Sequence, residues 1–132
     1  MKKYNKVFIV DDDKVFHFII KKLLLKNNID IIPIFFENGY DAIEELKENI
    51  NSETDFPDLI LLDINMPIMD GWQFLDEFRV VKSQLKKRPI IYLISSSDDI
   101  VDVNKSKEYN DEITDYVLKP MDTETIEKIF LK

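Results

Sequence analysis

The chain of 132 residues contains no cysteine, so disulfide bonds, thiol catalysis and cysteine-ligated metal sites are excluded. It contains only two glycines, Gly39 and Gly71, which lie far apart. Because a Walker A loop and a dinucleotide-binding fingerprint both need closely spaced glycines, those classes of nucleotide-binding enzyme are excluded as well. Apolar runs are short: none could span a bilayer, and the run 7–10 is too short for a signal peptide. We therefore expect a cytoplasmic protein.

Positive charge is also scarce. The chain carries 18 basic and 26 acidic residues, for a formal net charge of −8. Nucleic-acid backbones and anionic membranes are bound through basic surfaces, so we expect neither as a partner. The length and the ordinary apolar share of 45% are typical of one domain with a real hydrophobic core. We expect a single domain over 1–132, without an output domain.

Short β-rich runs alternate with stretches of helical periodicity along the whole chain. The runs predict strands at 6–10, 30–36, 59–63, 89–95 and 113–118, and helices over 14–26, 38–50, from 70, from about 98, and over 122–131. Strict alternation predicts an α/β fold in which helices cover both faces of a parallel sheet. Pro33 cannot donate to a strand ladder, which places the second strand at or near an edge.

The helix starts carry their own signals. Asn38 is the expected N-cap of the second helix, with Ile43, Leu46 and Ile50 on its inner face. Asp70 and Gln73 have the spacing of a capping box at the start of the third helix. The fourth helix has the weakest pattern.

Polar side chains follow the apolar strands directly. The carboxyl ends of the first, third, fourth and fifth strands carry, in order, Asp11, Asp12 and Asp13; Asp63; Ser95, Ser96 and Ser97; and Lys119 with Pro120. In a doubly wound sheet of order 2-1-3-4-5, a flavodoxin-like (βα)5 arrangement, these ends meet in one cleft.

The composition of this cleft limits its chemistry. Clustered carboxylates repel one another unless a cation joins them, and all-oxygen ligands favour magnesium, manganese or calcium. A metal, a lysine and a hydroxyl around a carboxylate form a phosphoryl-transfer site, in which the carboxylate can itself be the nucleophile.

Four sequence blocks sharpen this interpretation: "VDDD" at 10–13, "LLDINMPIMDG" at 61–71, "LISSS" at 93–97 and "YVLKP" at 116–120. In content, order and approximate spacing they resemble the receiver domain of bacterial two-component response regulators, close to the stand-alone chemotaxis type. The resemblance covers essentially the whole chain. It implies a phosphoacceptor signalling module that uses Mg²⁺, not a turnover enzyme.

The resemblance also implies residue roles. Asp63 would accept the phosphoryl group, and Lys119 would pair with Asp63. The metal would be bound by Asp12, Asp63 and the backbone carbonyl of Asn65, with Asp11 acting through water. Ser95 and Tyr116 would form the switch, and Pro120 would follow a cis bond. A histidine kinase or histidine phosphotransfer protein would donate the phosphoryl group. Output would pass to a protein bound at the face of the fourth helix, fifth strand and fifth helix.

Some residues have simpler interpretations or depart from the family pattern. Asp13 is a candidate helix N-cap, as is Ser97. The only histidine, His17, is interpreted as a structural or surface residue, and Phe35, Phe36 and Trp72 as core or rim aromatics. The segment "EYNDEITDY" at 108–116 lacks the small Gly-Ala turn often found before the fifth strand, so the output face is expected to differ from that of better-known regulators.

Two alternative functions remain open at this point. A phosphorelay intermediate would use the same site but pass the phosphoryl group to another histidine. A magnesium-dependent phosphatase with an aspartyl nucleophile usually has a second acid two residues after the nucleophile, where this chain has Asn65.

Overall fold

The computed structural model describes residues 3–96 and 99–131. Strands and helices alternate along the chain as the sequence predicts. They are β1 (Lys6–Val10), α1 (Lys14–Lys26), β2 (Ile32–Phe36), α2 (Gly39–Glu48), β3 (Leu59–Asp63), α3 (Gly71–Val81), β4 (Ile90–Ser95), α4 (Ile100–Ser106), β5 (Asp115–Leu118) and α5 (Thr123–Phe130), with 3₁₀ turns η1 (Lys82–Gln84) and η2 (Lys107–Tyr109).

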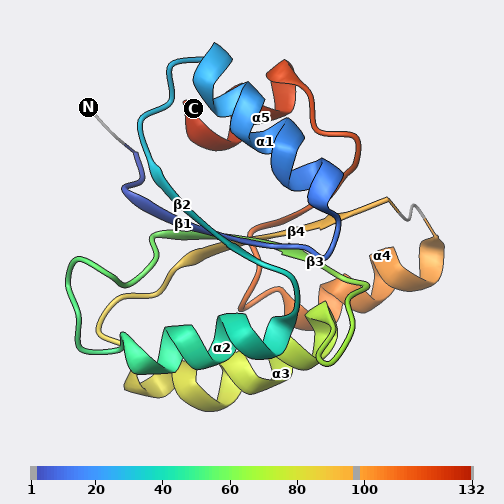
Figure 1. The fold of residues 1–132 in the computed structure, drawn as a ribbon. Helices are drawn as coiled ribbons and strands as arrows, with labels where there is room; N and C mark the ends of the chain where they lie inside the picture. The colour runs from blue at the N-terminus through green and yellow to red at the C-terminus, as the bar shows by residue number, and fades with distance from the viewer. Residues whose placement is uncertain (1–2, 97–98, 132) are drawn as a thin grey trace.

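The strands form one parallel sheet in the order β2-β1-β3-β4-β5, which confirms the predicted flavodoxin-like topology. Helices α1 and α5 cover one face of the sheet, and α2 and α3 cover the other (Figure 1). Strand β2, which contains Pro33, lies at the edge as predicted. Because the order reverses between β1 and β3, the carboxyl ends of these two strands border the natural site of such a fold.

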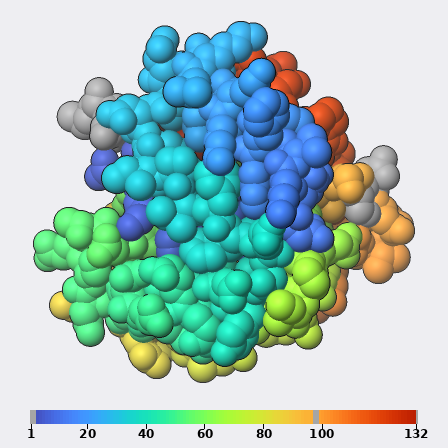
Figure 2. All heavy atoms as spheres, in the orientation of Figure 1, coloured from blue at the N-terminus to red at the C-terminus, as the bar shows by residue number. Residues whose placement is uncertain are grey.

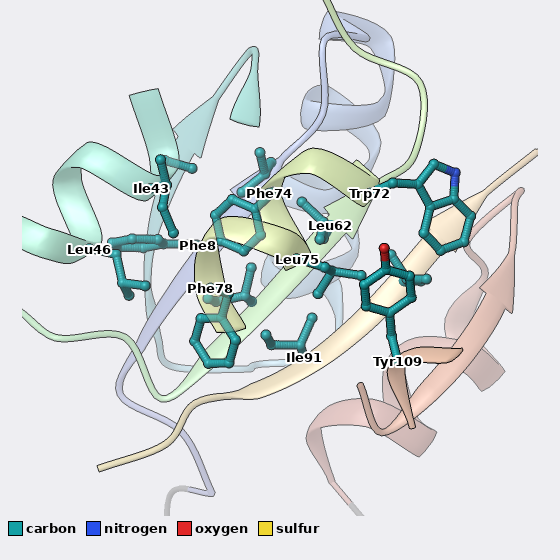
Figure 3. Close-up of a cluster of buried hydrophobic side chains, with 14 of the residues drawn as sticks. Phe8, Ile43, Leu46, Leu62, Trp72, Phe74, Leu75, Phe78, Ile91 and Tyr109 are labelled. Atoms are coloured by element: carbon teal, nitrogen blue, oxygen red, sulfur yellow. The ribbon is translucent and has the colours of Figure 1, made fainter. Parts of the chain in front are cut away.

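Side chains alternate between two hydrophobic clusters along the central strands. Phe8 and Val10 face the cluster under α2 and α3, while Val7 and Ile9 face the cluster under α1 and α5. Figure 3 shows the first cluster, in which Phe8, Leu62 and Phe78 are at most 1% exposed. Each such side chain contributes about 1.5–3 kcal/mol by burial, so the strand backbones that carry the polar ends are held firmly.

Short polar side chains start the helices. Asp13, Asn38, Asp70 and Asp122 accept backbone N–H groups as N-caps of α1, α2, α3 and α5, and Asp70 with Gln73 completes the capping box. The cap predictions for Asp13, Asn38 and Asp70 are therefore confirmed.

Several predicted boundaries were wrong. Strands β2, β4 and β5 begin one or two residues later than the apolar runs do. Helix α2 ends at Glu48, so the half-buried Ile50 lies beyond it, and α4 begins at Ile100 with Asp99 as its N-cap. The predicted cap at Ser97 lies outside the described residues. For β2 and β5 the cause is that Ile31 and Ile113, which precede the strands, pack on the core without joining the ladder.

Candidate functional site

Three polar side chains lie buried at the carboxyl ends of the central strands. Asp11 follows β1, Asp63 ends β3 and Ser95 ends β4; their exposures are 1%, 7% and 1%. The register sets Asp63 beside Ile94, and the Lys119 N–H donates to the Ser95 carbonyl at 2.8 Å. The sheet therefore brings the polar ends of four strands to one cleft, as predicted.

The acids of this cleft form a compact cluster. Asp11, Asp12 and Asp63 each offer a carboxylate oxygen, and these oxygens lie within 4.8 Å of one another. Asp12 is exposed, whereas the other two are buried. Asp13 instead turns to the helix, where its Oδ1 accepts the Val15 N–H at 2.9 Å. The cluster can bind a divalent metal through hard oxygen ligands.

Lys119 is the cation of the cleft. Its Nζ lies 2.6 Å from Asp11 Oδ2 and 3.9 Å from Asp63 Oδ1. The ammonium also lies 4.5 Å from the ring centroid of Phe16 on α1. The Lys119–Pro120 bond is cis, as predicted. The expected contact with Asp63 is present but secondary, because Asp11 is the closer partner.

The electrostatics single out Asp63. Burial and the negative charge of Asp11 raise its pKa from 3.8 to about 7, although Lys119 and a hydrogen bond from the Ile64 N–H act in the opposite direction. The metal-free carboxyl of Asp63 therefore binds a proton far more tightly than an exposed aspartate does. A cation placed beside it would favour the ionised, nucleophilic form.

Both glycines of the chain pack against the loop that follows Asp63. A Cβ at Gly71 would lie 2.4 Å from the Asp63 carbonyl oxygen, and one at Gly39 would lie 2.7 Å from the Met69 carbonyl oxygen. The Gly71 N–H donates to Ile64 and the Gly39 N–H to Met69, at 2.8 and 2.9 Å. The loop is thus fixed from two sides by close backbone approach.

Ile68 occupies an unusual position within this loop. Its φ is +68°, in the left-handed region that β-branched residues avoid, and its side chain is 78% exposed. Asn65, three residues earlier in the same loop, is also exposed. Sequence reasoning missed Ile68 and Gly39, although a glycine-poor chain with both glycines near one loop was an available signal for the latter.

The predicted switch residues lie on neighbouring strands. Ser95 is buried at the end of β4, and Tyr116 is half-buried on β5, where it packs against the cluster under α2 and α3. Leu93 of β4 pairs with Tyr116. The two residues therefore lie on paired strands, two positions apart in register.

The segment before β5 carries a polar network in place of a small turn. Glu112 is 6% exposed; it accepts from the Arg79 Nε at 2.9 Å and also from the Lys82 Nζ. Although burial acts to raise it, hydrogen bonds from Lys82 and Arg79 hold the pKa of Glu112 below its ordinary value. Where the family often has a small turn, this chain therefore has a set of ion pairs that links the end of α3 and η1 to the α4–β5 connection.

Aromatic contacts also link α3 to the segment between α4 and β5. Tyr109 stacks on Trp72, with ring centroids 5.5 Å apart (Figure 3), and its hydroxyl donates to Asp76 at 2.8 Å. Burial and the hydrogen bond to Asp76 raise the pKa of Tyr109 to about 12. Trp72 is buried, as its interpretation as a core aromatic requires. On the opposite face of the sheet, His17 is 9% exposed and its ring centroid lies 4.9 Å from that of Phe35.

The chain belongs to the response regulator receiver domain family, whose model matches residues 7–130. The fold and the acidic cleft are those of a phosphoacceptor signalling module rather than a turnover enzyme. Receiver domains work with histidine kinases in two-component signalling. Of the described helices, none has both the length and the apolar character that crossing a membrane requires.

Individual relatives agree with this assignment. Chemotaxis protein CheY of Bacillus subtilis (strain 168) is 35% identical over 82 residues, 62% of this chain and 62% of that protein. The crystal structure of a two-component response regulator from Cytophaga hutchinsonii matches with a TM-score of 0.82 and 28% identity, over 96% of this chain and 94% of that one. The Mn²⁺-bound response regulator Rcp1 matches with a TM-score of 0.73 and 26% identity, over 95% and 88%. The chain spans less than two thirds of the length of the curated relatives it matches, 62% for CheY and less for others.

Proposed function

We propose that Asp63 is the phosphoacceptor of a signalling switch, and that it takes the phosphoryl group from a phosphohistidine of a kinase or phosphotransfer protein. The observation that carries the proposal is the buried Asp63 carboxyl at a strand end, grouped with Asp11 and Asp12 and flanked by Lys119. The proposal takes residues 1–132 as a single receiver domain whose output passes through protein contacts.

The residues present fit a hard divalent cation. Three carboxylates within 4.8 Å repel one another, and only one lysine, already close to Asp11, compensates them among the described residues. We assign Mg²⁺ to this site, held by Asp12, Asp63 and the Asn65 backbone carbonyl, with Asp11 acting through water. When bound, the ion would neutralise carboxylate and phosphoryl oxygens; the Mn²⁺-bound state of Rcp1 supports a divalent ion in such a cleft.

The chain's own residues account for the transfer. An ionised oxygen of Asp63 attacks phosphorus, a P–O bond forms, and the P–N bond to the donor histidine breaks with the electron pair leaving on nitrogen. Lys119, now 3.9 Å from Asp63, is placed to donate to a phosphoryl oxygen. Buried walls hold the nucleophile in place, so positioning and electrostatics supply most of the acceleration.

The phosphorylated state would be transmitted through β4 and β5. The Ser95 hydroxyl, at the end of β4, would turn toward a phosphoryl oxygen, and Tyr116 would rotate inward against the space this opens. A charge-assisted hydrogen bond of roughly 1.5–3 kcal/mol shifts a two-state equilibrium about ten- to a hundredfold. The affected surface is the face of α4, β5 and α5, where a downstream protein would dock.

The test is labelling with acetyl phosphate and Mg²⁺. Wild type should incorporate one phosphoryl group and Asp63→Asn none; unchanged labelling of that variant would contradict the proposal.

Asp12→Asn should weaken Mg²⁺ binding far more than Asp13→Asn, because Asp13 caps α1 outside the cluster. Ser95→Ala should still be labelled but lose the NMR response of α4 and β5 to beryllofluoride.

A further inference from the structure

Helix α1 is strongly basic in an otherwise acidic protein. Residues Lys14–Lys26 contain four lysines and no acid, whereas the chain as a whole carries −8. Among the described residues, no carboxylate lies within salt-bridge distance of Lys21 or Lys22. Instead Lys21 Nζ lies 4.7 Å from the ring centroid of Phe35, and Lys22 Nζ lies 5.0 Å from that of Phe18. These cations are available to an anionic partner.

A groove runs between α1 and the edge strand β2, and we call it the α1–β2 groove. The part beside the C-terminal half of α1, about 300 Å³, is lined by Lys21, Leu24, Leu25, Ile29, Ile31 and Pro33. A hollow of about 490 Å³ shares Lys21 and continues past Phe18 and Phe35. Figure 2 shows α1 in blue and the cyan segment with β2 side by side on the face turned to the viewer.

The rim of the groove exposes large apolar side chains. Leu25 is 79% exposed and Phe18 57%. Lys14, Phe18, Lys21 and Leu25 recur at spacings of three and four residues, so they form one stripe along the β2 side of α1. Lys14 Nζ lies 3.6 Å from Glu37 Oε1, so Lys21 is the cation of this stripe that remains for a partner. An exposed helix face that alternates large apolar side chains with lysines has the character of a binding surface.

The form of the occupant follows from the edge of β2. The Ile32 N–H and the Phe36 carbonyl point to β1, so Pro33 and Phe35 present their backbone outward. Pro33 has no N–H, so β2 offers no hydrogen-bond donor at this position to a strand that would be added along its outer edge. A helix that lays an apolar ridge into the groove needs no such donor.

Charge selects among the possible occupants. A second copy of this chain, related by a two-fold axis, would bring the lysines of two α1 helices together. An anionic membrane is flat and would cover the whole face, including Glu37 and Asp41, which line the hollow beyond Phe18, whereas a helix seated along Leu25, Lys21 and Phe18 can end before these acids. We propose that the α1–β2 groove binds an acidic amphipathic helix of a partner protein, with apolar side chains on Leu25 and Phe18 and carboxylates on Lys21 and Lys22.

This surface is separate from the phosphoacceptor chemistry. The more apolar part of the groove lies between the C-terminal half of α1 and the start of β2, whereas Asp63 lies at the carboxyl end of the central strand β3. Leu25→Glu should therefore leave acetyl-phosphate labelling of Asp63 unchanged. The inference does not rest on the proposed function, and the two can fail independently.

The experiment is an NMR titration of the full chain with two synthetic 18-residue helical peptides. Both peptides carry the same leucine stripe, flanked by Glu in one and by Lys in the other. The acidic peptide should shift amides of α1 and β2 saturably, and the basic peptide should not. Leu25→Glu and Lys21→Glu should each weaken binding at least tenfold, while Val80→Glu, at a 67% exposed apolar residue of α3, should not.

Four results would overturn the inference. They are the absence of shifts in α1 and β2, equal binding of both peptides, a wild-type dimer in sedimentation that Leu25→Glu dissolves, and Leu25-dependent binding to phosphatidylcholine–phosphatidylserine vesicles. The third would assign the groove to a second copy, and the fourth to a membrane. Circular dichroism of each variant would confirm that it is folded.

Discussion

Replacing Asp63 by its neutral isostere, asparagine, should stabilise the protein. In the metal-free fold the pKa of Asp63 is raised from 3.8 to about 7 by burial and by Asp11. The folded state thus binds a proton more tightly than the unfolded chain does. Between about pH 4 and pH 7, folding takes up a proton at this site, so the free energy of unfolding falls as the pH rises. Asp63→Asn removes this penalty together with the charge.

The size of the effect follows from the shift. A rise of roughly three pKa units at about 1.4 kcal/mol each gives a penalty of at most about 4 kcal/mol once Asp63 is fully ionised, above pH 7. Below pH 4 the carboxyl is protonated in both states and the penalty vanishes. We expect Asp63→Asn to gain about 2–4 kcal/mol at pH 8, less at pH 5.5 and nearly nothing at pH 4.

The assay is urea unfolding with EDTA at pH 4, 5.5, 7 and 8, followed by circular dichroism. The matched control is Asp13→Asn, which removes one charge just outside the cleft and keeps an N-cap of similar strength. Its difference from wild type should stay small at every pH. Added Mg²⁺ should stabilise wild type by about 1.4 kcal/mol for each tenfold excess over its dissociation constant, and Asp63→Asn much less.

Two outcomes would refute this reasoning. The first is an Asp63→Asn gain that does not change between pH 4 and pH 8, which would mean that side-chain shape rather than ionisation is responsible. The second is a loss of stability at pH 8, which would mean that Lys119 and the cleft stabilise the charge more than burial and Asp11 oppose it.

Three further perturbations probe the surroundings of the site. Glu112→Gln should lower the free energy of unfolding by about 1–3 kcal/mol at pH 7, as measured by urea unfolding. The folded state lowers the pKa of Glu112, so this carboxylate stabilises the fold above its unfolded pKa and the stabilisation is lost as the pH falls through the folded pKa. A difference between variant and wild type that persists undiminished at pH 3 would argue against this. Ile68→Gly should raise the free energy of unfolding by about 1 kcal/mol by relieving the left-handed backbone, while Ile68→Val should not, and equal effects would rule out strain as the cause. Gly39→Ala should displace Met69 and slow acetyl-phosphate labelling per folded molecule; wild-type rates would show that the loop tolerates the shift.

The fold could be predicted from the sequence because the apolar runs, the helical periodicity and their order along the chain all indicated the same architecture. Continuous apolar runs such as 59–62 identify strands buried on both faces, and helices alternate with them without exception. Boundaries were less predictable where loop residues are also apolar. Ile113 extends the run before β5 and packs on the core, yet β5 begins only at Asp115.

The members of the site were predictable for a geometric reason. Parallel strands end at a common edge of the sheet, so a polar residue after each apolar run must lie near the others. The contacts among these side chains were not predictable, because they depend on packing from other elements. The ion pairs of Glu112 with Arg79 and Lys82 likewise join residues about 30 positions apart, and no local sequence pattern predicts them.

Lys119 shows what this difference means for function. The resemblance predicted its pairing with Asp63, but in the resting fold the ammonium lies closer to Asp11, beside the Phe16 ring. Asp63 is therefore left with burial and a neighbouring acid, and its pKa stays near 7. A carboxylate in that position is stabilised in its ionised form when a cation reaches the cleft. A cation that pairs with the ionised carboxylate would offset this penalty, so part of the stability that the metal-free fold lacks at Asp63 would be recovered on metal binding.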